Sequence, residues 1–475
     1  MDILRHMCSL MPLKDAARAA CVSRGFLRCW RHYPNLIFNS QILGLIRNEL
    51  GSDAEEVPLY DSAFKVDDRE SYVVNKIDHI IQNHSGIGVK VLKLRLFLCR
   101  NISSAVLDKW LETVIKPGIE ELSLEMSSCK KGTEYNFPSS VLSNKAGGGT
   151  IQSLFLDSCT FHPTVTLGCN SLTSLHLCAV HIFGEELGQF LSNSFALERL
   201  VITNCSDIIQ LKVPCLMRQP KHLKVTKCQN LQVIEMDAPK LSTFIYGDVG
   251  VHISLGDPLP VKHILLMGYN QPNTICYART KLPSIMSNVE SLIVSSNNEM
   301  ISTPMVPIKF LHLKFLEIYL SELLAFLPSY DFFSLVSFLD ASPALETFIL
   351  HVAQRRLRRD SIPDGEHTDL RRAPHCLHDK LQNVTITGFN STKSMIELTS
   401  HILQNAPSLK CITLDTADLY DKDHLAMGEC TPMMRGGILE ARKAVEAIRR
   451  YIVEKVPSCV ELKLLEPCSE CHIIE

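Results

Sequence analysis

The sequence predicts an α/β repeat fold, in which a small module of three helices precedes an irregular solenoid of short strands. Three observations support this prediction. Short segments with helical spacing occupy the start, one strand pattern recurs through the middle, and an amphipathic segment stands near the end. With 46% hydrophobic and 21% charged residues, the chain of 475 residues can bury a large core.

The first element is a helical module. Its three helices are predicted within residues 2–10, 13–23 and 24–36, and the third is expected to end before Pro34. Ile3, Met7 and Leu10 recur at helical spacing on one face of the first helix. Pro12 ends that helix, because proline has no amide hydrogen to donate. Three helices this short cannot bury a large core, so such a module usually completes itself against a partner.

The next segment, residues 39–90, is predicted to be a linker with helices that lead into the solenoid. Its clearest helical piece is KIDHIIQNHSG at 76–86.

A nine-residue pattern then recurs from residue 91 onward. Its clearest copies are VLKLRLFLC (91–99), IQSLFLDSC (151–159), LTSLHLCAV (172–180) and LERLVITNC (197–205). Apolar residues stand at the first, fourth and sixth places, and Cys usually stands at the ninth. This is the L-x-x-L-x-L-x-x-N/C pattern of leucine-rich repeats. Weaker copies, such as LQVIEMDAP (231–239) and VELKLL (460–465), follow at irregular spacing. The sequence therefore predicts a leucine-rich-repeat solenoid over 91–428.

Each L-x-L core predicts a short strand whose two apolar residues point inward and whose middle residue points outward. One repeat cannot bury its own apolar face, so neighbouring repeats must stack. The ninth position lies inside the stack and takes a small residue. It is occupied by Cys99, Cys159, Cys205 and Cys228, which we expect to be packing residues. The outward positions are the candidate contacts for a bound protein: Phe155, His176, Val201 and Lys224.

Helices are predicted between some of these strands and at the end of the chain. They are expected over 185–196, 394–407 and 437–456. The last is amphipathic, with an apolar stripe formed by Ile438, Val445 and Ile452, and it is predicted to cover the end of the solenoid. Residues 429–475 are thus interpreted as a capping helix, a last strand and a tail.

Two segments interrupt the repeats. The glycine-rich stretch at 143–153 lacks the Lys-Ser/Thr ending of a phosphate-binding loop and is interpreted as a surface loop. The polar insertion at 354–380 contains six arginines diluted by acidic residues. It is either a solvated loop or a patch for nuclear import or partner binding.

The opening module resembles an F-box. DILRHMCSLMPLKDAARAACVSRGFLRCW (2–30) matches the family pattern at Ile3, Leu4, Leu10, Pro12, Leu13, Asp15, Arg18, Val22, Ser23, Arg24 and Trp30. LQVIEMDAPKLSTFIYGD (231–248) and the segment 381–414 resemble later elements of plant F-box/leucine-rich-repeat proteins. The resemblance covers nearly the whole chain and implies a three-helix F-box over 1–38 followed by an irregular leucine-rich-repeat solenoid.

This resemblance implies a substrate-recognition subunit of an SCF-type E3 ubiquitin ligase. The helical module would bind a Skp-type adaptor, and through it a cullin, while the repeats would bind a target protein. The adaptor contacts implied are Ile3, Leu4, Met7, Leu10, Pro12, Leu13, Val22, Phe26 and Trp30. Such a subunit is not an enzyme and needs no cofactor.

The sequence departs from the F-box pattern at its first edge. The family usually places Leu-Pro and an acidic residue before Asp-Ile, whereas here Asp2 follows Met1. We therefore expect an F-box whose N-terminal edge is truncated. The alternative function is an adaptor-free or degenerate leucine-rich-repeat scaffold.

Composition argues against several other classes. The formal net charge is −3, which does not favour binding nucleic acid through bulk charge. No secretory signal and no apolar run long enough for a membrane span are visible, so we expect a protein of the nucleus and/or cytoplasm with reduced cysteines.

Two kinds of chemistry would compete with this interpretation. Cys468, Cys471 and His472 have the spacing of c-type haem attachment, but that chemistry takes place after export. The other histidines, serines and acids form no nucleophile elbow and no metal-ligand spacing, so neither a catalytic nor a metal site is predicted.

Overall fold

The computed structural model describes residues 2–44, 66–97, 99, 102–126, 134–143, 148–164, 169–214, 220–247, 251–255, 261–268, 272–297, 299–322, 330–354, 370–371, 376–417 and 435–467. The chain forms two compact units. Unit 1 is Met1–Lys240 with Val251–Gly256, and unit 2 is Leu241–Gly250 with Asp257–Glu475.

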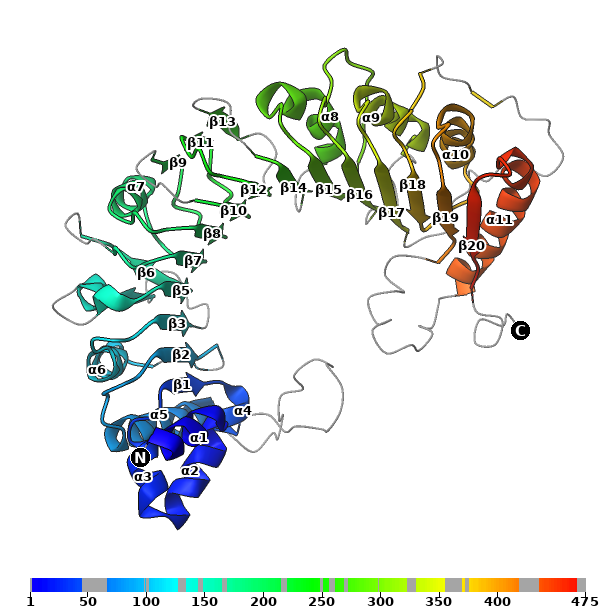
Figure 1. The fold of residues 1–475 in the computed structure, drawn as a ribbon. Helices are drawn as coiled ribbons and strands as arrows, with labels where there is room; N and C mark the ends of the chain where they lie inside the picture. Colours follow the sequence, from blue (N-terminus) through cyan, green and yellow to red (C-terminus); the bar gives the residue numbers. More distant parts are fainter. Residues whose placement is uncertain are drawn as a thin grey trace. The chain divides into compact units, whose positions relative to one another are not determined.

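The first three helices of unit 1 pack into a small module (Figure 1, dark blue). They are α1 (Asp2–Leu10), α2 (Leu13–Val22) and α3 (Arg24–Trp30). Ser23 separates α2 from α3, and its hydroxyl accepts a 3.2 Å hydrogen bond from the Gly25 amide, which caps α3. The first two predicted helices are confirmed. The third ends at Trp30, a few residues before the end predicted ahead of Pro34, because the chain turns there toward a strand.

That strand, β1 (Asn35–Phe38), begins the sheet inside the range predicted for the helical module. It pairs in parallel with β2 (Val91–Arg95) and places Leu36 beside Leu92, both fully buried. The helices α4 (Ser40–Leu43) and α5 (Val66–Asn83) come between these strands, and α5 contains most of the helix predicted over 76–86.

The main sheet of unit 1 is parallel, in the order β1-β2-β3-β5-β7-β8-β10. The strands beyond β2 are β3 (Glu121–Glu125), β5 (Ser153–Asp157), β7 (Ser174–Cys178), β8 (Arg199–Thr203) and β10 (His222–Thr226). The four clear copies of the repeat form β2, β5, β7 and β8, so their prediction as strands is confirmed. In β5, Leu154 and Leu156 are buried while the residues between them stay half-exposed, as the L-x-L pattern requires.

A second layer lies behind this sheet. It consists of the helices α6 (Ser104–Val114) and α7 (Gly184–Ser192), the 3₁₀ turns η1 (Ser139–Leu142) and η2 (Gly148–Thr150), the paired strands β4 (Tyr135–Phe137) and β6 (Cys159–Phe161), and a sheet of β9 (Gln210–Val213), β11 (Val233–Met236) and β13 (His252–Leu255). The segment 231–239 was predicted as a copy of the main repeat. It instead forms β11 in this second layer, because it is the return path of the repeat whose main strand is β10.

The turns after β5, β7, β8 and β10 each have a left-handed residue just before the ninth position of the repeat. Ser158, Ala179, Asn204 and Lys227 all have positive φ angles, between 48° and 60°. The amide of each of the first three donates to a carbonyl at the end of the next strand, for example from Ala179 to Thr203 at 2.8 Å. This turn carries the chain off the sheet and buries the residue that follows it.

Unit 2 repeats the parallel arrangement in the order β12-β14-β15-β16-β17-β18-β19-β20. Its strands are β12 (Thr243–Tyr246), β14 (His263–Gly268), β15 (Ser291–Asn297), β16 (Phe315–Glu322), β17 (Thr347–Gln354), β18 (Asn383–Thr387), β19 (Cys411–Asp415) and β20 (Glu461–Leu465). Its helices are α8 (Thr274–Ile285), η3 (Phe332–Leu335), α9 (Val336–Ala341), α10 (Lys393–Asn405), α11 (Arg435–Tyr451) and η6 (Val453–Lys455). Figure 1 shows α8, α9, α10 and α11 on the same side of this sheet.

The helices predicted over 394–407 and 437–456 are confirmed as α10 and as α11 with η6, and the helix predicted over 185–196 is confirmed as α7. The helices α6, α8 and α9 have no counterpart among the predicted elements. Longer repeats in unit 2 carry helices where unit 1 mostly carries short strands and turns, which accounts for the irregular spacing in the sequence.

Candidate interaction surfaces

The first candidate surface is an apolar face on α1. Ile3, Met7 and Leu10 are 77%, 46% and 72% exposed. Their spacing of four and three residues places them on one side of the helix. On the opposite side of α1, Cys8 is buried against the rest of the module. The side that carries Ile3, Met7 and Leu10 is left uncovered. Large apolar side chains gathered in this way mark interaction sites.

The other predicted adaptor contacts divide by burial. Val22, at the end of α2, is 86% exposed, and Pro12 is also exposed. Leu4 and Phe26 are half-buried. They remain predicted contacts.

Leu13 and Trp30 are buried within the module, and this corrects their assignment to the contact surface. Trp30 is 8% exposed, and its ring meets the edge of the His84 ring with centroids 6.3 Å apart. His84 also lies 3.0 Å from the Tyr33 carbonyl. These residues join the module to the chain that follows α5, and their contribution is to hold the module in place.

The second candidate surface is the strand face of unit 1. The registers of β5, β7, β8 and β10 align Phe155, His176, Val201 and Lys224 in one lateral row. The Phe155 and His176 rings meet edge to face, with centroids 4.3 Å apart. Val201 is only 3% exposed, which corrects its assignment as an outward contact, whereas the other three are half-exposed.

The row continues across β3 and β2 through Ser123 and Lys93. The sequence pattern missed Ser123 because the strand at 121–125 was not recognised, whereas Lys93 is the middle residue of a recognised repeat copy. Beside them, Lys93 pairs with Glu121 at 2.7 Å, and Arg95 pairs with Glu125 at 3.0 Å. Charged pairs therefore lie on β2 and β3, and an aromatic pair lies on β5 and β7.

His176 is an uncharged member of this row. Burial is the largest cause, and with the cations of Lys224 and Arg199 it lowers the pKa of His176 to about 4. At neutral pH the row therefore offers an aromatic edge and a neutral imidazole next to the ammonium of Lys224.

The equivalent row of unit 2 is mainly aliphatic. Leu265, Ile293, Glu317 and Ile349 align through the registers of β14 to β17, and the three aliphatic side chains are half-buried. Glu317 accepts a 2.6 Å hydrogen bond from the Tyr319 hydroxyl, and His351 lies 3.1 Å from the same carboxylate. The sequence offered no separate signal for this row, since its members are only the middle residues of weaker repeat copies.

The cysteines at the ninth repeat position are buried, as predicted. Cys99, Cys159, Cys205 and Cys228 are at most 2% exposed. Burial raises the pKa of the Cys159 thiol to about 12 and that of Cys205 further. Because they stay protonated and buried, these thiols act as packing residues.

Several predicted features fall outside the described residues. They are Cys468, Cys471 and His472, part of the glycine-rich stretch, and residues 355–369 and 372–375 of the polar insertion. Among the helices that the structure describes, none has the length and apolar character needed to cross a membrane.

Comparison with known proteins adds the family. The sequence profile described as "At1g61320/AtMIF1, LRR domain" matches residues 80–469. Over 462 residues the chain is 24% identical to the Arabidopsis thaliana F-box/FBD/LRR-repeat protein At5g56810, covering 92% of this chain and 93% of that protein. It is 23% identical to the Arabidopsis thaliana FBD-associated F-box protein At1g66310, covering 88% of each.

Among solved structures, a leucine-rich-repeat protein of Leptospira interrogans, LIC12759, is 14% identical and covers 79% of this chain and 90% of that one, with a TM-score of 0.31. The profile match spans most of the chain, from the end of α5 to just beyond β20. The chain therefore belongs to the leucine-rich-repeat family of the Arabidopsis At1g61320/AtMIF1 type, among plant F-box/leucine-rich-repeat proteins.

Proposed function

We propose that this protein is a substrate-recognition subunit of an SCF-type E3 ubiquitin ligase. Its helical module would bind a Skp-type adaptor and through it a cullin, and its repeats would bind a target protein. The observation that carries the proposal is the exposed apolar face of Ile3, Met7 and Leu10, on a module that resembles an F-box. The F-box names of the Arabidopsis relatives agree with it.

The size of this face suits a protein partner. Fully burying a side chain such as Ile3 or Leu10 stabilises a complex by about 1.5–3 kcal/mol. A few such anchors commonly dominate an interface. Val22, the most exposed large apolar residue of the module, adds a further anchor.

In this proposal the protein makes and breaks no covalent bond. It would hold a target near the ubiquitin-transfer machinery, so that transfer is accelerated by proximity. The proposed assembly with an adaptor and a cullin would take place in the nucleus and/or cytoplasm.

The strand faces are proposed to bind the target. Repeat proteins bind through the face that their stacked strands leave open. In unit 1 the row from Lys93 through Phe155 and His176 to Lys224 offers charge and an aromatic edge. A protein segment with acidic and aromatic side chains would complement it.

Binding of a purified recombinant Skp-type adaptor tests the proposal. The dissociation constant would be measured by isothermal titration for the wild type and for an Ile3→Asp/Leu10→Asp double variant. Two buried charges should weaken binding at least a hundredfold. Ile87→Asp is the matched control, because Ile87 is 65% exposed in unit 1 but lies outside the helical module.

Binding by the wild type and the control, with loss in the double variant, is the expected result. Absence of wild-type binding at micromolar concentration would exclude the adaptor function. It would instead favour the alternative, an adaptor-free leucine-rich-repeat scaffold.

A further inference from the structure

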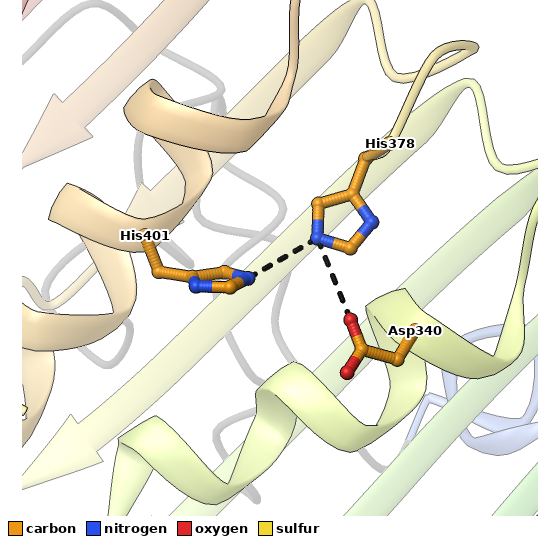
Figure 2. A group of neighbouring side chains, drawn as sticks. All are labelled: Asp340, His378 and His401. Atoms are coloured by element: carbon orange, nitrogen blue, oxygen red, sulfur yellow. Dashed lines mark hydrogen bonds and ion pairs between the residues drawn. The ribbon is translucent and has the colours of Figure 1, made fainter. Parts of the chain in front are cut away.

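A buried cluster of potential metal ligands lies in unit 2 and belongs to neither candidate interaction surface. It consists of Asp340 on α9, His378 shortly before β18, and His401 on α10. Figure 2 shows the three side chains converging from these separate segments. The Nε2 atoms of the two histidines are 3.3 Å apart, and Nε2 of His378 is 3.8 Å from Oδ1 of Asp340.

These separations suit a tetrahedral zinc ion. With Zn–N and Zn–O bonds of about 2.0–2.1 Å, neighbouring ligand atoms of a tetrahedron lie about 3.3 Å apart. All three ligand atoms of the cluster lie within 4.8 Å of one another, so small side-chain rotations suffice to close the site. Two imidazoles and a carboxylate are ligands that zinc accepts.

Asp340 provides a second, independent observation. Its Oδ1 atom is buried and has no hydrogen-bond partner among the residues that the structure describes. A buried carboxylate oxygen without a donor is costly, and a cation would remove that cost.

Charged groups of both signs surround the cluster. The cations of Arg279 and Lys309 lie near Asp340. Arg279 and Lys309 would repel a bound metal cation. The carboxylate of Asp379, which acts on His378, would offset part of that repulsion.

Two residues lie beside the site. The Cys376 thiol is near Asp340 and stands two positions before His378, but it is not one of the three groups whose ligand atoms lie within 4.8 Å of one another. It becomes a fourth ligand only after its side chain rotates, and water is the other choice. Asn405, one turn beyond His401 on α10, places its amide nitrogen 3.2 Å from Nδ1 of His401. The same nitrogen donates to the His401 carbonyl at 2.9 Å. A metal on Nε2 leaves the proton on Nδ1, so it requires the Asn405 amide group to turn away from that atom.

We propose that Asp340, His378 and His401 form a Zn²⁺ site that joins the chain before β18 to α9 and α10. The site goes beyond the proposed ligase function and does not depend on it. Its role is structural: it fixes the point at which the polar insertion rejoins the repeats.

The test uses the full chain purified without chelators. Zinc content would be measured by mass spectrometry after dialysis, and zinc affinity by competition with a chromophoric chelator. We expect one Zn²⁺ per chain, and at least tenfold weaker binding in His378→Gln, His401→Gln and Asp340→Asn. His351→Gln is the matched control, because His351 lies on the strand face of the same unit and also contacts a carboxylate. It should bind zinc like the wild type.

A Cys468→Ser/Cys471→Ser variant distinguishes this site from the paired cysteines near the end of the chain. Zinc lost in that variant but retained in His378→Gln and His401→Gln would overturn the proposal, as would a wild type that retains no zinc.

Cobalt substitution in the wild type needs no variant to fold. An intense visible spectrum typical of tetrahedral Co²⁺ is expected, with a sulfur charge-transfer band if Cys376 is the fourth ligand. That band should disappear in Cys376→Ser. Absence of any tetrahedral spectrum would contradict the site.

Discussion

Glu397 and His401 lie one helical turn apart on α10, and each contacts one end of the same chain segment. Glu397 accepts hydrogen bonds from the amide of Arg371 at 2.9 Å and from its Nε at 2.8 Å. His401 faces His378, whose amide donates to the Asn405 carbonyl at 2.8 Å. The end of the polar insertion is therefore attached to one face of α10 at two points.

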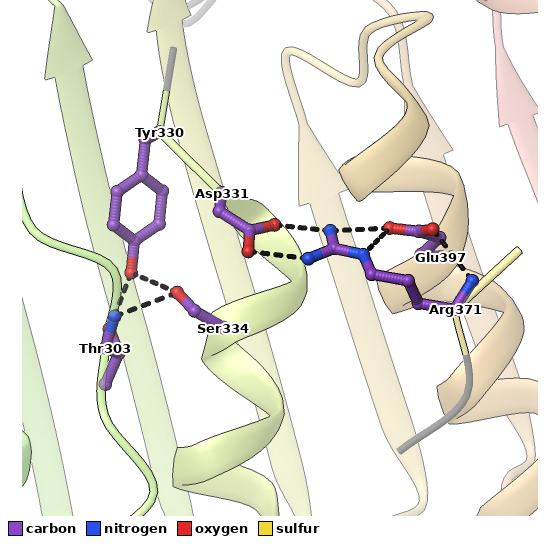
Figure 3. A network of polar contacts seen from close by, with 6 residues as sticks. All are labelled: Thr303, Tyr330, Asp331, Ser334, Arg371 and Glu397. Carbon is purple, nitrogen blue, oxygen red and sulfur yellow. Dashed lines mark hydrogen bonds and ion pairs between the residues drawn. The ribbon is translucent and has the colours of Figure 1, made fainter. Parts of the chain in front are cut away.

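The first prediction concerns the contact between Arg371 and Glu397. Its guanidinium also holds the Asp331 carboxylate with two hydrogen bonds, of 2.7 and 2.9 Å, as Figure 3 shows. Removing it in Arg371→Ala leaves Glu397, whose side chain is 0% exposed, as an uncompensated buried charge. Breaking such a pair costs about 3 kcal/mol. Hydrogen exchange of α10 amides should accelerate accordingly.

Arg449→Ala is the matched control for that experiment. Arg449 pairs with Glu466 at 2.6 Å, but both side chains are well exposed, so the loss should stay below about 1 kcal/mol. Equal exchange rates in the two variants would show that the buried carboxylate does not need its partner.

Gly388 is predicted to resist replacement by alanine. It has a φ of +70°, and an added Cβ would lie 1.9 Å from the Val352 carbonyl oxygen. The left-handed conformation alone costs a non-glycine residue about 1–2 kcal/mol, and the clash adds a backbone shift. Gly88 separates the two effects, because it has a φ of +81° and nothing within 4 Å of an added Cβ. In thermal unfolding, Gly388→Ala should lower the midpoint clearly more than Gly88→Ala, and similar shifts would refute the close approach.

The repeat strands were predictable because their burial alternates with a period of two and the same pattern recurs. β1 was missed since NLIF (35–38) follows directly on helices and carries no repeat pattern, although its Leu36 and Phe38 are fully buried. The pattern at 231–239 predicts a strand correctly but not the layer in which β11 lies. Layer assignment depends on the path of the chain between repeats, and local periodicity does not contain it.

The candidate zinc site was not predictable for a different reason. Asp340, His378 and His401 lie on three segments that only the stacking of repeats brings together. No ligand spacing within one segment marks them, apart from the short Cys376-x-His378 pair. The exposed face of α1, by contrast, follows directly from helical spacing, while the burial of Trp30 depends on a contact with His84, far along the chain.

Acid sensitivity of unit 1 is predicted from His176. Its pKa is about 4 in the folded protein against an ordinary value of 6.5. Between these values the unfolded chain binds the proton and the folded chain does not, so the free energy of unfolding falls as pH decreases from about 6.5 to about 4. In His176→Gln this dependence should be weaker, as it should in Lys224→Gln, which removes a cation that lowers the pKa. Tryptophan fluorescence in urea reports unit 1, since both tryptophans lie there. Identical pH slopes in all three proteins would contradict the assignment.

Thiol reactivity should follow burial. Cys21 and Cys459 are exposed, whereas Cys159 and Cys205 are buried with raised pKa values. Because the thiolate is the reactive form, iodoacetamide at neutral pH should label the exposed pair first and the buried pair only after unfolding. Peptide mass spectrometry over a time course measures this order. Early labelling of Cys205 would mean that the repeat opens locally.

The burial of Trp30 changes how adaptor binding must be tested. A Trp30→Ala variant removes a core side chain and should cost about 3–5 kcal/mol, so loss of adaptor binding there would report a damaged module. Leu10 is 72% exposed, so Leu10→Ala should weaken adaptor binding while leaving the fluorescence-monitored unfolding midpoint of unit 1 unchanged. The two variants therefore distinguish loss of a direct adaptor contact from loss of the module's stability. If Leu10→Ala binds the adaptor like the wild type, the exposed face of α1 is not the contact, and the adaptor proposal loses the observation that carries it.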